Sequence, residues 1–416
     1  MIKRLPMNLS DAERVLPGIR RAALALTAVL GVASLSQAQL LPSGAVAVQR
    51  ATGFGFTEGP LYDRVNDRVL FTNLSGADIV SYSLTTLAAT IVDPNSGAAN
   101  GMFFDAAGNI VSADRDAKRI AQRSPANVAT VTAVLATGWN GPPITTFIGP
   151  NDLVIDAAGG IYFSDPNYGS GGVGSVEAVY YRSAAGVVSR LLTGFSHPNG
   201  LILSPDQSVF YLAVEGEKRI MAYDVTAPGV LANPRQFART DVAPLAGATN
   251  GPDGLTVDPS GNIYAAVQNA VFAWNPAGQR LFSLSVGQDP TNVELGGRNG
   301  KTLFITAGNG LYSVGLNIVP KLPGDFEYDG DVDGADLAKF TAEYGTALTA
   351  AALNSDANGD GYADGADLLA WQRSLAAPPI VVTVPEPQAV TLTILAAIAA
   401  AARCFTVRSR SLRSPC

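Results

Sequence analysis

Short apolar segments alternate with turn-forming residues between about residue 44 and residue 318. In the clearest copies, a polar residue is followed by Gly or Asp, an apolar stretch and Asp-x-x-Gly, as in residues 100–108, 151–159 and 253–261. Apolar runs of this length, bounded by Gly, Pro and Asp, are typical of β-strands. No long amphipathic helical pattern interrupts them, so this part of the chain is predicted to be all-β.

The copies recur at a regular distance along the chain. They begin at residues 58, 100, 151, 199, 253 and 292, with spacings of 42, 51, 48, 54 and 39 residues. Repeats of this length, each built from short strands, are typical of the blades of a β-propeller. The pattern therefore predicts an all-β, six-bladed β-propeller over residues 39–322.

Each repeat opens with a polar residue at the start of the strand that is expected to lie innermost. These residues should converge on the central channel; they are Glu58, Asn100, Asn151, Asn199, Asp253 and Asn292. Carboxylate and amide oxygens aimed at one axis suit a hard cation such as calcium. Asn and Asp also cap turns, which is an alternative explanation for each single repeat. Glu58 breaks the Asn/Asp series, and a turn role explains it poorly.

Two acidic loops follow the repeats, thirty-one residues apart. The first loop offers the potential metal ligands Asp325, Glu327, Asp329, Asp331, Asp333 and Asp336. The second offers Asp356, Asn358, Asp360, Tyr362 (through its carbonyl), Asp364 and Asp367. This spacing, with Gly at the sixth position, is that of an EF-hand-like calcium loop. Each loop leads into a predicted short helix, over residues 335–344 and 366–374, which makes residues 323–376 a small all-α module. The duplicated loop and helix, with Asp at the twelfth position, resembles a type I dockerin.

Composition narrows the chemistry. The chain has one histidine, His197, and two cysteines, Cys404 and Cys416, in 416 residues. Zinc sites of His and Cys, thiol nucleophiles, disulfide frameworks and haem ligation are therefore disfavoured. Any metal should be bound by oxygen, and any general base should be a carboxylate. The net charge of −7, with no interior basic block, argues against a nucleic-acid partner.

Both ends of the chain have the composition of targeting segments. Basic residues precede an uncharged run from Ala22 to Ser36, which predicts a signal peptide over residues 1–38; an uncleaved membrane anchor is the alternative. A Pro-rich linker, residues 377–387, contains Pro385-Glu386-Pro387 and precedes an apolar segment with a basic tail, residues 388–416. This order of parts resembles the PEP-CTERM sorting signal. It predicts an exported protein at the cell envelope or outside the cell.

Four motifs in register carry a second resemblance. Residues 57–60 (TEGP), 149–153 (GPNDL), 198–201 (PNGL) and 251–255 (GPDGL) are similar to those of the gluconolactonase and senescence-marker-protein-like family, which includes luciferin-regenerating-enzyme-like proteins. The resemblance implies a six-bladed propeller with one divalent cation, usually Ca²⁺, that hydrolyses sugar lactones or related esters. The segments Val111–Arg115, Ala213–Glu215 and Val267–Asn269 depart from the family pattern, which leaves the substrate open.

The same resemblance implies roles for single residues. Glu58, Asn199 and Asp253 would bind the metal, and Asn151, or its neighbour Asp152, would complete the metal site or contact substrate. We interpret Asp253 as the general base and Glu58 as a second catalytic carboxylate that mainly balances charge. The residues expected to contact substrate are Asn100, Asn151, Asp152 and His197.

These observations leave two classes of function. The first is an exported, calcium-dependent lactone or ester hydrolase. The second is a non-catalytic cell-surface propeller that binds carbohydrate or protein, because fold alone does not decide function. The convergent carboxylates Glu58 and Asp253 favour the hydrolase, and a strictosidine-synthase-like activity is a weaker third alternative. The dockerin-like module adds a cohesin-like or envelope partner to the expected small-molecule lactone or ester.

Overall fold

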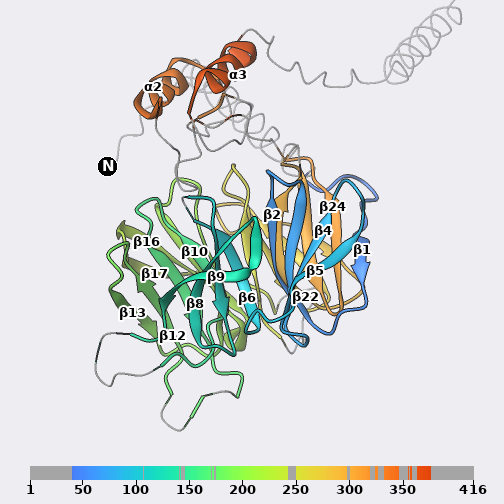
Figure 1. Cartoon of the computed structure of the whole chain (residues 1–416), viewed down its shortest axis with the longest axis vertical. Coiled ribbons are helices and arrows are strands. Elements are labelled where there is room, and N and C mark those ends of the chain that lie inside the picture. Colours follow the sequence, from blue (N-terminus) through green and yellow to red (C-terminus); the bar gives the residue numbers. More distant parts are fainter. Residues whose placement is uncertain are drawn as a thin grey trace, which may run out of the picture. The chain divides into compact units, whose positions relative to one another are not determined.

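The computed structural model describes residues 40–375 apart from residues 106, 140, 142–145, 170, 173–174, 242–249, 298–299, 319–323, 327–331, 346–354, 356 and 358–362. Six four-stranded antiparallel sheets are arranged as the blades of a propeller (Figure 1). The first strands of successive blades, β2, β6, β10, β14, β18 and β22, contact one another in a closed ring and so surround the axis. The predicted six-bladed β-propeller is confirmed.

The first three blades follow one another along the chain. Blade 1 contains β2 (Thr57–Asp63), β3 (Arg68–Asn73), β4 (Asp78–Ser83) and β5 (Ala89–Asp93). Blade 2 contains β6 (Ala99–Phe104), β7 (Ile110–Asp114), β8 (Arg119–Ser124) and β9 (Asn127–Ala136). Blade 3 contains β10 (Leu153–Ile155), β11 (Ile161–Asp165), β12 (Ala178–Arg182) and β13 (Val188–Thr193).

The next two blades repeat this order, and the last closes the ring. Blade 4 contains β14 (Pro198–Leu203), β15 (Val209–Val214), β16 (Arg219–Ala227) and β17 (Val230–Arg239), with the short 3-10 helix η2 (Glu215–Glu217) before β16. Blade 5 contains β18 (Leu255–Val257), β19 (Ile263–Val267), β20 (Ala270–Trp274) and β21 (Arg280–Ser285). Blade 6 contains β22 (Pro290–Gly296), β23 (Thr302–Ala307), β24 (Gly310–Gly315) and the early strand β1 (Val48–Thr52).

The Asp-x-x-Gly motif of the repeats forms the turn after each of several inner strands. Asp258 Oδ1 accepts the backbone N–H groups of Ser260 and Asn262, both at 2.9 Å, and Gly261 follows with a positive φ of 79°. Asp105 makes the equivalent bond to Asn109 N–H at 2.8 Å. The motif is therefore local turn chemistry, and its Asp residues are not the ones that face the axis.

The described residues after the propeller form two helices, α2 (Gly334–Glu343) and α3 (Gly365–Leu375), each within one residue of its predicted bounds. Phe326, Phe340 and Ala363 are buried together, and Leu337, Leu368 and Trp371 pack against them. Among the described residues no helix is long and apolar enough to cross a membrane. The predicted signal peptide, linker and sorting segment lie outside the described residues.

Candidate functional site

Five of the six predicted axial residues lie at equivalent places, just before or at the start of the inner strands. Hydrogen bonds between neighbouring blades define this layer: Gly101 N–H donates to the Asn151 carbonyl at 2.7 Å, and Gly254 N–H donates to the Thr291 carbonyl at 2.9 Å. Thr291 is thus the blade-6 counterpart of Asn151. The layer therefore consists of Glu58, Asn100, Asn151, Asn199, Asp253 and Thr291.

The prediction that Asn292 is the axial residue of blade 6 is wrong by one position. Asn292 lies one residue further along its strand, at the level of Asp152. Asn292 Oδ1 accepts the N–H of Val293 at 2.8 Å, just as Asp152 Oδ1 accepts the N–H of Leu153 at 2.8 Å. The hydroxyl of Thr291, which takes the expected place, donates to the Thr57 carbonyl at 2.7 Å and ties blade 6 to blade 1.

Glycine at this second level makes room for the two polar side chains. A Cβ on Gly101 would lie 2.2 Å from Asp152 Oδ1, and a Cβ on Gly254 would lie 2.0 Å from the amide of Asn292. Any larger residue at these two positions would displace the polar group of the neighbouring blade. The Asn-Gly and Asp-Gly pairs of the repeats thus serve the packing of the channel as well as the strand start.

The carboxylates that meet here repel one another. Burial and the charge of Asp152 together raise the pKa of Glu58 to about 8, against the hydrogen bond from Gly59 N–H. Burial also raises the pKa of Asp253 well above its usual value, and the charges of Glu58, Glu215 and Asp152 act in the same direction. A group of acids that disfavour each other's ionisation is an environment that a bound cation would stabilise.

Two amide oxygens at the same level also lack partners. Asn199 Oδ1 and Asn100 Oδ1 are buried and accept no hydrogen bond in the described part of the chain. A buried oxygen without a donor is unfavourable unless something else binds it, and amide oxygens are regular ligands of calcium. In residues 40–375, with the gaps given above, no three carboxylate, imidazole or thiolate groups form a ready-made metal cluster, so the fit depends on these amides. The donor set Glu58, Asn199 and Asp253 fits a hard divalent cation.

Sequence reasoning missed Tyr168 and did not assign Glu215 a role. Tyr168, in the loop between β11 and β12, donates a hydrogen bond from its hydroxyl to Glu215 Oε2 and accepts one from Asn199 Nδ2 at 2.8 Å. Burial raises the pKa of this hydroxyl, and the charges of Asp253 and Glu215 raise it further. Tyr168 lies in a loop, and Glu215 lies in the short helix η2 after the second strand of blade 4, so neither carries a periodic signal.

His197 lies near the predicted site but is not buried in it. Its ring stacks on Tyr168 with centroids 4.8 Å apart and an interplanar angle of 7°. Its side chain is 37% exposed, and its Nε2 is 4.0 Å from Glu177 Oε1. The contact of His197 with substrate stays a prediction.

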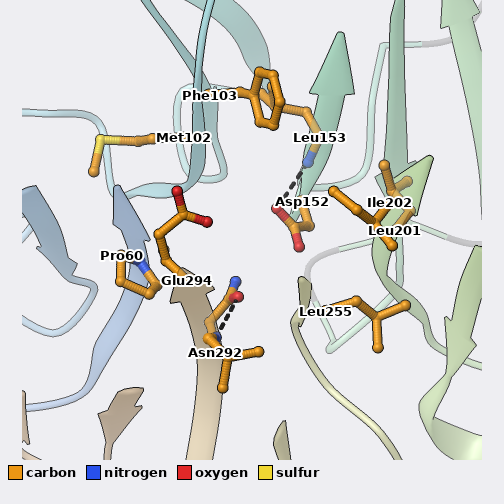
Figure 2. Close-up of a pocket in the computed structure, with 12 residues that line it drawn as sticks. Pro60, Met102, Phe103, Asp152, Leu153, Leu201, Ile202, Leu255, Asn292 and Glu294 are labelled. Carbon is orange, nitrogen blue, oxygen red and sulfur yellow. Dashed lines mark hydrogen bonds between the residues drawn. The ribbon is translucent and has the colours of Figure 1, made fainter. Parts of the chain in front are cut away.

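A small cavity lies further along the channel (Figure 2). Its volume is about 20 Å³, and Asp152, Asn292 and Glu294 line it together with apolar residues such as Phe103 and Leu255. Burial raises the pKa of Glu294 to about 8, and Asp152 adds to this effect. A polar cavity of this size has room for a water molecule. Glu294 occupies a position that is apolar in the equivalent strands of most blades, and the repeat pattern did not single it out.

In the described part of the two acidic loops, the last carboxylate of each loop accepts backbone hydrogen bonds. Asp336 accepts the backbone N–H groups of Phe326 and Asp333, at 2.5 and 2.8 Å. Asp367 does the same for Ala357 and Asp364, at 2.7 and 2.8 Å. Asp333 and Asp364 cap the two helices by accepting from Ala335 and Ala366, and Asp325 is buried. The remaining predicted ligands lie outside the described residues: Glu327, Asp329, Asp331, Asp356, Asn358, Asp360 and Tyr362.

Comparisons with known proteins agree with this architecture. The family described as SMP-30/Gluconolactonase/LRE-like region matches residues 56–309, more than half of the chain. The gluconolactonase of Zymomonas mobilis is 26% identical over 289 residues, which cover 64% of this chain and 79% of that protein.

Two solved structures share the fold. A gluconolactonase from Xanthomonas campestris has a TM-score of 0.59 and 23% identity, covering 67% of this chain and 91% of its own. Regucalcin, a calcium-binding protein from Agrobacterium tumefaciens, has a TM-score of 0.52 and 18% identity, covering 66% of this chain and 94% of its own. At these identities the two structures support the fold alone.

Proposed function

This chain belongs to the SMP-30/gluconolactonase/LRE-like family and is a lactonase-like hydrolase, and we propose that it hydrolyses sugar lactones or related esters with a divalent cation, calcium, bound at the propeller axis. The observation that carries the proposal is the convergence of the buried Glu58 and the partly buried Asp253 with the unpartnered oxygen of Asn199. The relative from Zymomonas is named a gluconolactonase, and the structural neighbour regucalcin is described as calcium-binding.

In this proposal Glu58, Asn199 and Asp253 hold the cation, and Asn151 completes the site. A bound divalent cation supplies Lewis-acid polarisation of the lactone carbonyl. Asp253 accepts a proton from the attacking water, whose oxygen bonds to the carbonyl carbon; the ring C–O bond then breaks, and the leaving oxygen takes this proton from Asp253 to give the hydroxy acid. Burial, together with the charges of the neighbouring acids, raises the pKa of Asp253, which suits a general base. Glu58 balances charge.

Substrate contacts in this proposal come from the same end of the inner strands. Asn100 and Asn151 lie in the layer that contains Glu58 and Asp253, and Asp152 lies one level further along the channel. The partly exposed His197 lies on the opposite side of this layer, just before the start of β14. Amide and carboxylate groups of this kind hydrogen-bond the hydroxyls of a sugar lactone. The polar lining therefore favours polyhydroxylated substrates over apolar esters.

The proposed function is tested by assaying the purified chain against a panel of sugar lactones with calcium, zinc, manganese or a chelator. We expect turnover that chelator abolishes and that calcium restores. Glu58→Gln, which keeps size but removes a charge, should lose turnover, whereas Asp206→Asn on an exposed turn should not. Cation binding without turnover of any lactone would instead support a propeller that binds carbohydrate or protein.

For residues 323–376 we propose a dockerin-like module that binds calcium in both acidic loops and contacts a cohesin-like or envelope partner of an exported protein. Eleven acidic and two basic residues between Gly324 and Arg373 support this proposal. Such a concentration of charge should fold only when metal is bound. Far-UV circular dichroism of residues 322–378 should show helix with calcium and lose it with chelator. Identical spectra would contradict coupled folding and binding.

A further inference from the structure

The amide of Asn199 has two chemically different ends, and only one of them can bind a cation. Its nitrogen donates to Tyr168 Oη at 2.8 Å and lies 3.5 Å from Glu215 Oε2. Its oxygen is buried and accepts no hydrogen bond in the described part of the chain. The contacts on the nitrogen therefore decide which end is left free for a ligand.

Tyr168 is itself held by contacts on both its hydroxyl and its ring. The hydroxyl donates to Glu215 Oε2, so its lone pairs remain available to the Asn199 amide. The ring stacks on His197 with an interplanar angle of 7°. Half of the Tyr168 side chain is exposed, which means that burial alone does not fix it.

Glu177 accepts backbone hydrogen bonds on both sides of the ring stack between Tyr168 and His197. Its Oε1 accepts the backbone N–H of Asn167, next to Tyr168, at 2.8 Å and the backbone N–H of His197 at 3.1 Å. One carboxylate thus joins the β11–β12 loop to the start of β14. His197 has a positive φ of 51°, a strained conformation for a residue with a Cβ, which this contact helps to hold.

From these contacts we infer that Tyr168 is a positioning residue: with Glu215 it holds the Asn199 amide nitrogen so that the amide oxygen is presented to the cation. This inference rests on the proposed function, because it assigns Asn199 to the cation site. Without the Tyr168 hydroxyl, the amide can rotate and present its N–H groups, which cannot bind a cation. Tyr168 therefore acts on cation affinity and not on the proton transfer.

The test is Tyr168→Phe, which removes the hydroxyl and keeps the ring that stacks on His197. Calcium binding to the full chain is measured by titration calorimetry. The binding component that is present in the parent and absent in Glu58→Gln is assigned to the propeller site, which separates it from the other calcium sites of the chain. Tyr168→Phe should weaken this component about tenfold, the size expected for one lost hydrogen bond. The thermal midpoint in chelator should stay unchanged. The calcium concentration for half-maximal lactone turnover should rise by the same factor, with turnover at saturating calcium within about twofold of the parent.

Tyr181→Phe is the matched control, because its hydroxyl bonds Asp156 in the turn at the other end of β10, and it should leave the component unchanged. Glu215→Gln is a second variant, which also tests the inference if Tyr168→Phe does not fold. It should weaken calcium binding at the propeller site by a similar factor. An unchanged affinity in the folded variant would overturn the inference and leave the proposed function intact. If Glu58→Gln removes no component, the cation site and the inference both fail.

Discussion

At the residue scale, Asp253 and Glu58 share one environment but have different proposed roles. Burial raises the pKa of both acids, and the charges of Asp152 and Glu215 act on both in the same direction. A hydrogen bond from the Asn199 side chain lowers the pKa of Asp253 in part, and the Gly59 N–H and the Asn292 side chain do the same for Glu58. The two acids therefore differ in the amide side chain that contacts each of them, Asn199 for Asp253 and Asn292 for Glu58.

Replacing Asp253 by Asn tests its role as general base. The change keeps the size and one oxygen but removes the proton acceptor, so lactone turnover should fall at least about a hundredfold. The measurement is turnover at saturating calcium, with calcium binding followed by calorimetry in parallel. Turnover equal to the parent's, with calcium still bound, would show that another group accepts the proton.

Asp165 provides a pH prediction that does not involve the proposed metal ligands. Its carboxylate is buried and accepts the N–H groups of Ile148 and Gly149 at 2.9 and 2.7 Å. Burial nevertheless raises the pKa of Asp165 from 3.8 to about 6. The folded state thus binds the proton more tightly than the unfolded state, and ionisation above about pH 4 weakens folding.

The corresponding variant is Asp165→Asn, which stays neutral at every pH. Relative to this variant, the parent should lose about 3 kcal/mol in the free energy of unfolding as the pH rises from about 4 to about 7. Urea denaturation of both proteins in chelator at each pH measures the difference. A difference that does not change with pH would mean that Asp165 ionises normally in the folded chain.

At the element scale, the inner strands were predictable because their signal is local. A polar residue, then Gly or Asp, then an apolar stretch recur in blades 2 to 5, so the placement of Asn100, Asn199 and Asp253 at equivalent positions followed from the repeat. Blade 6 has Asn292-Val293, and matching Asn to Asn shifted the alignment by one residue. The hydrogen bond from Gly254 to the Thr291 carbonyl corrects it. Tyr168 and Glu215 approach Asn199 only through tertiary structure, so no spacing in the sequence could reveal them.

The connection between blades 1 and 2 depends on one buried cation. Arg123 in β8 is fully buried, and its guanidinium bonds both oxygens of Asp114 at 2.9 and 3.1 Å and the Ser96 carbonyl at 2.7 Å. Its Nε is 3.5 Å from Asp93, at the end of β5. Removal of the guanidinium would leave Asp93 without this cation and Asp114 with Arg119 as its remaining cationic partner.

Arg123→Met should therefore lower the free energy of unfolding by about 3–5 kcal/mol. Arg119→Met is the matched control, because Arg119 also contacts Asp114, at 2.7 Å, but its side chain is 25% exposed. The control should lower it by no more than about 1 kcal/mol. Denaturant midpoints of the two variants give the comparison, and equal losses would mean that burial does not distinguish the two ion pairs.

At the scale of the whole molecule, the propeller is closed by pairing the first described strand with the last blade. Strand β1 pairs with β24, from Val48 with Ser313 to Thr52 with Gly310, and a bulge lies between Gln49 and Ala51. Residues before β1 contribute too, since Leu40 and Leu41 pack against the core of blades 5 and 6. Blade 6 is thus assembled from both ends of the repeat region, with β1 as its outermost strand.

Deletion of all residues before Gly53 removes β1 and leaves β24 as an unpaired edge. The loss of the four residue pairs between β1 and β24 and of the packing around Leu40 should lower the thermal midpoint by roughly 10 °C or more in a domain of this size. The exposed β24 edge should also promote association between chains, which light scattering detects. A chain that begins at Leu40 keeps β1 and is the control. The inner ends of the blades, with Glu58 and Asp253, remain in the shortened chain. Lactone turnover should therefore persist at temperatures below the lowered thermal midpoint. Loss of turnover there would show that closure of blade 6 also positions Glu58 and Asp253, through the hydrogen bond from Thr291 to Thr57.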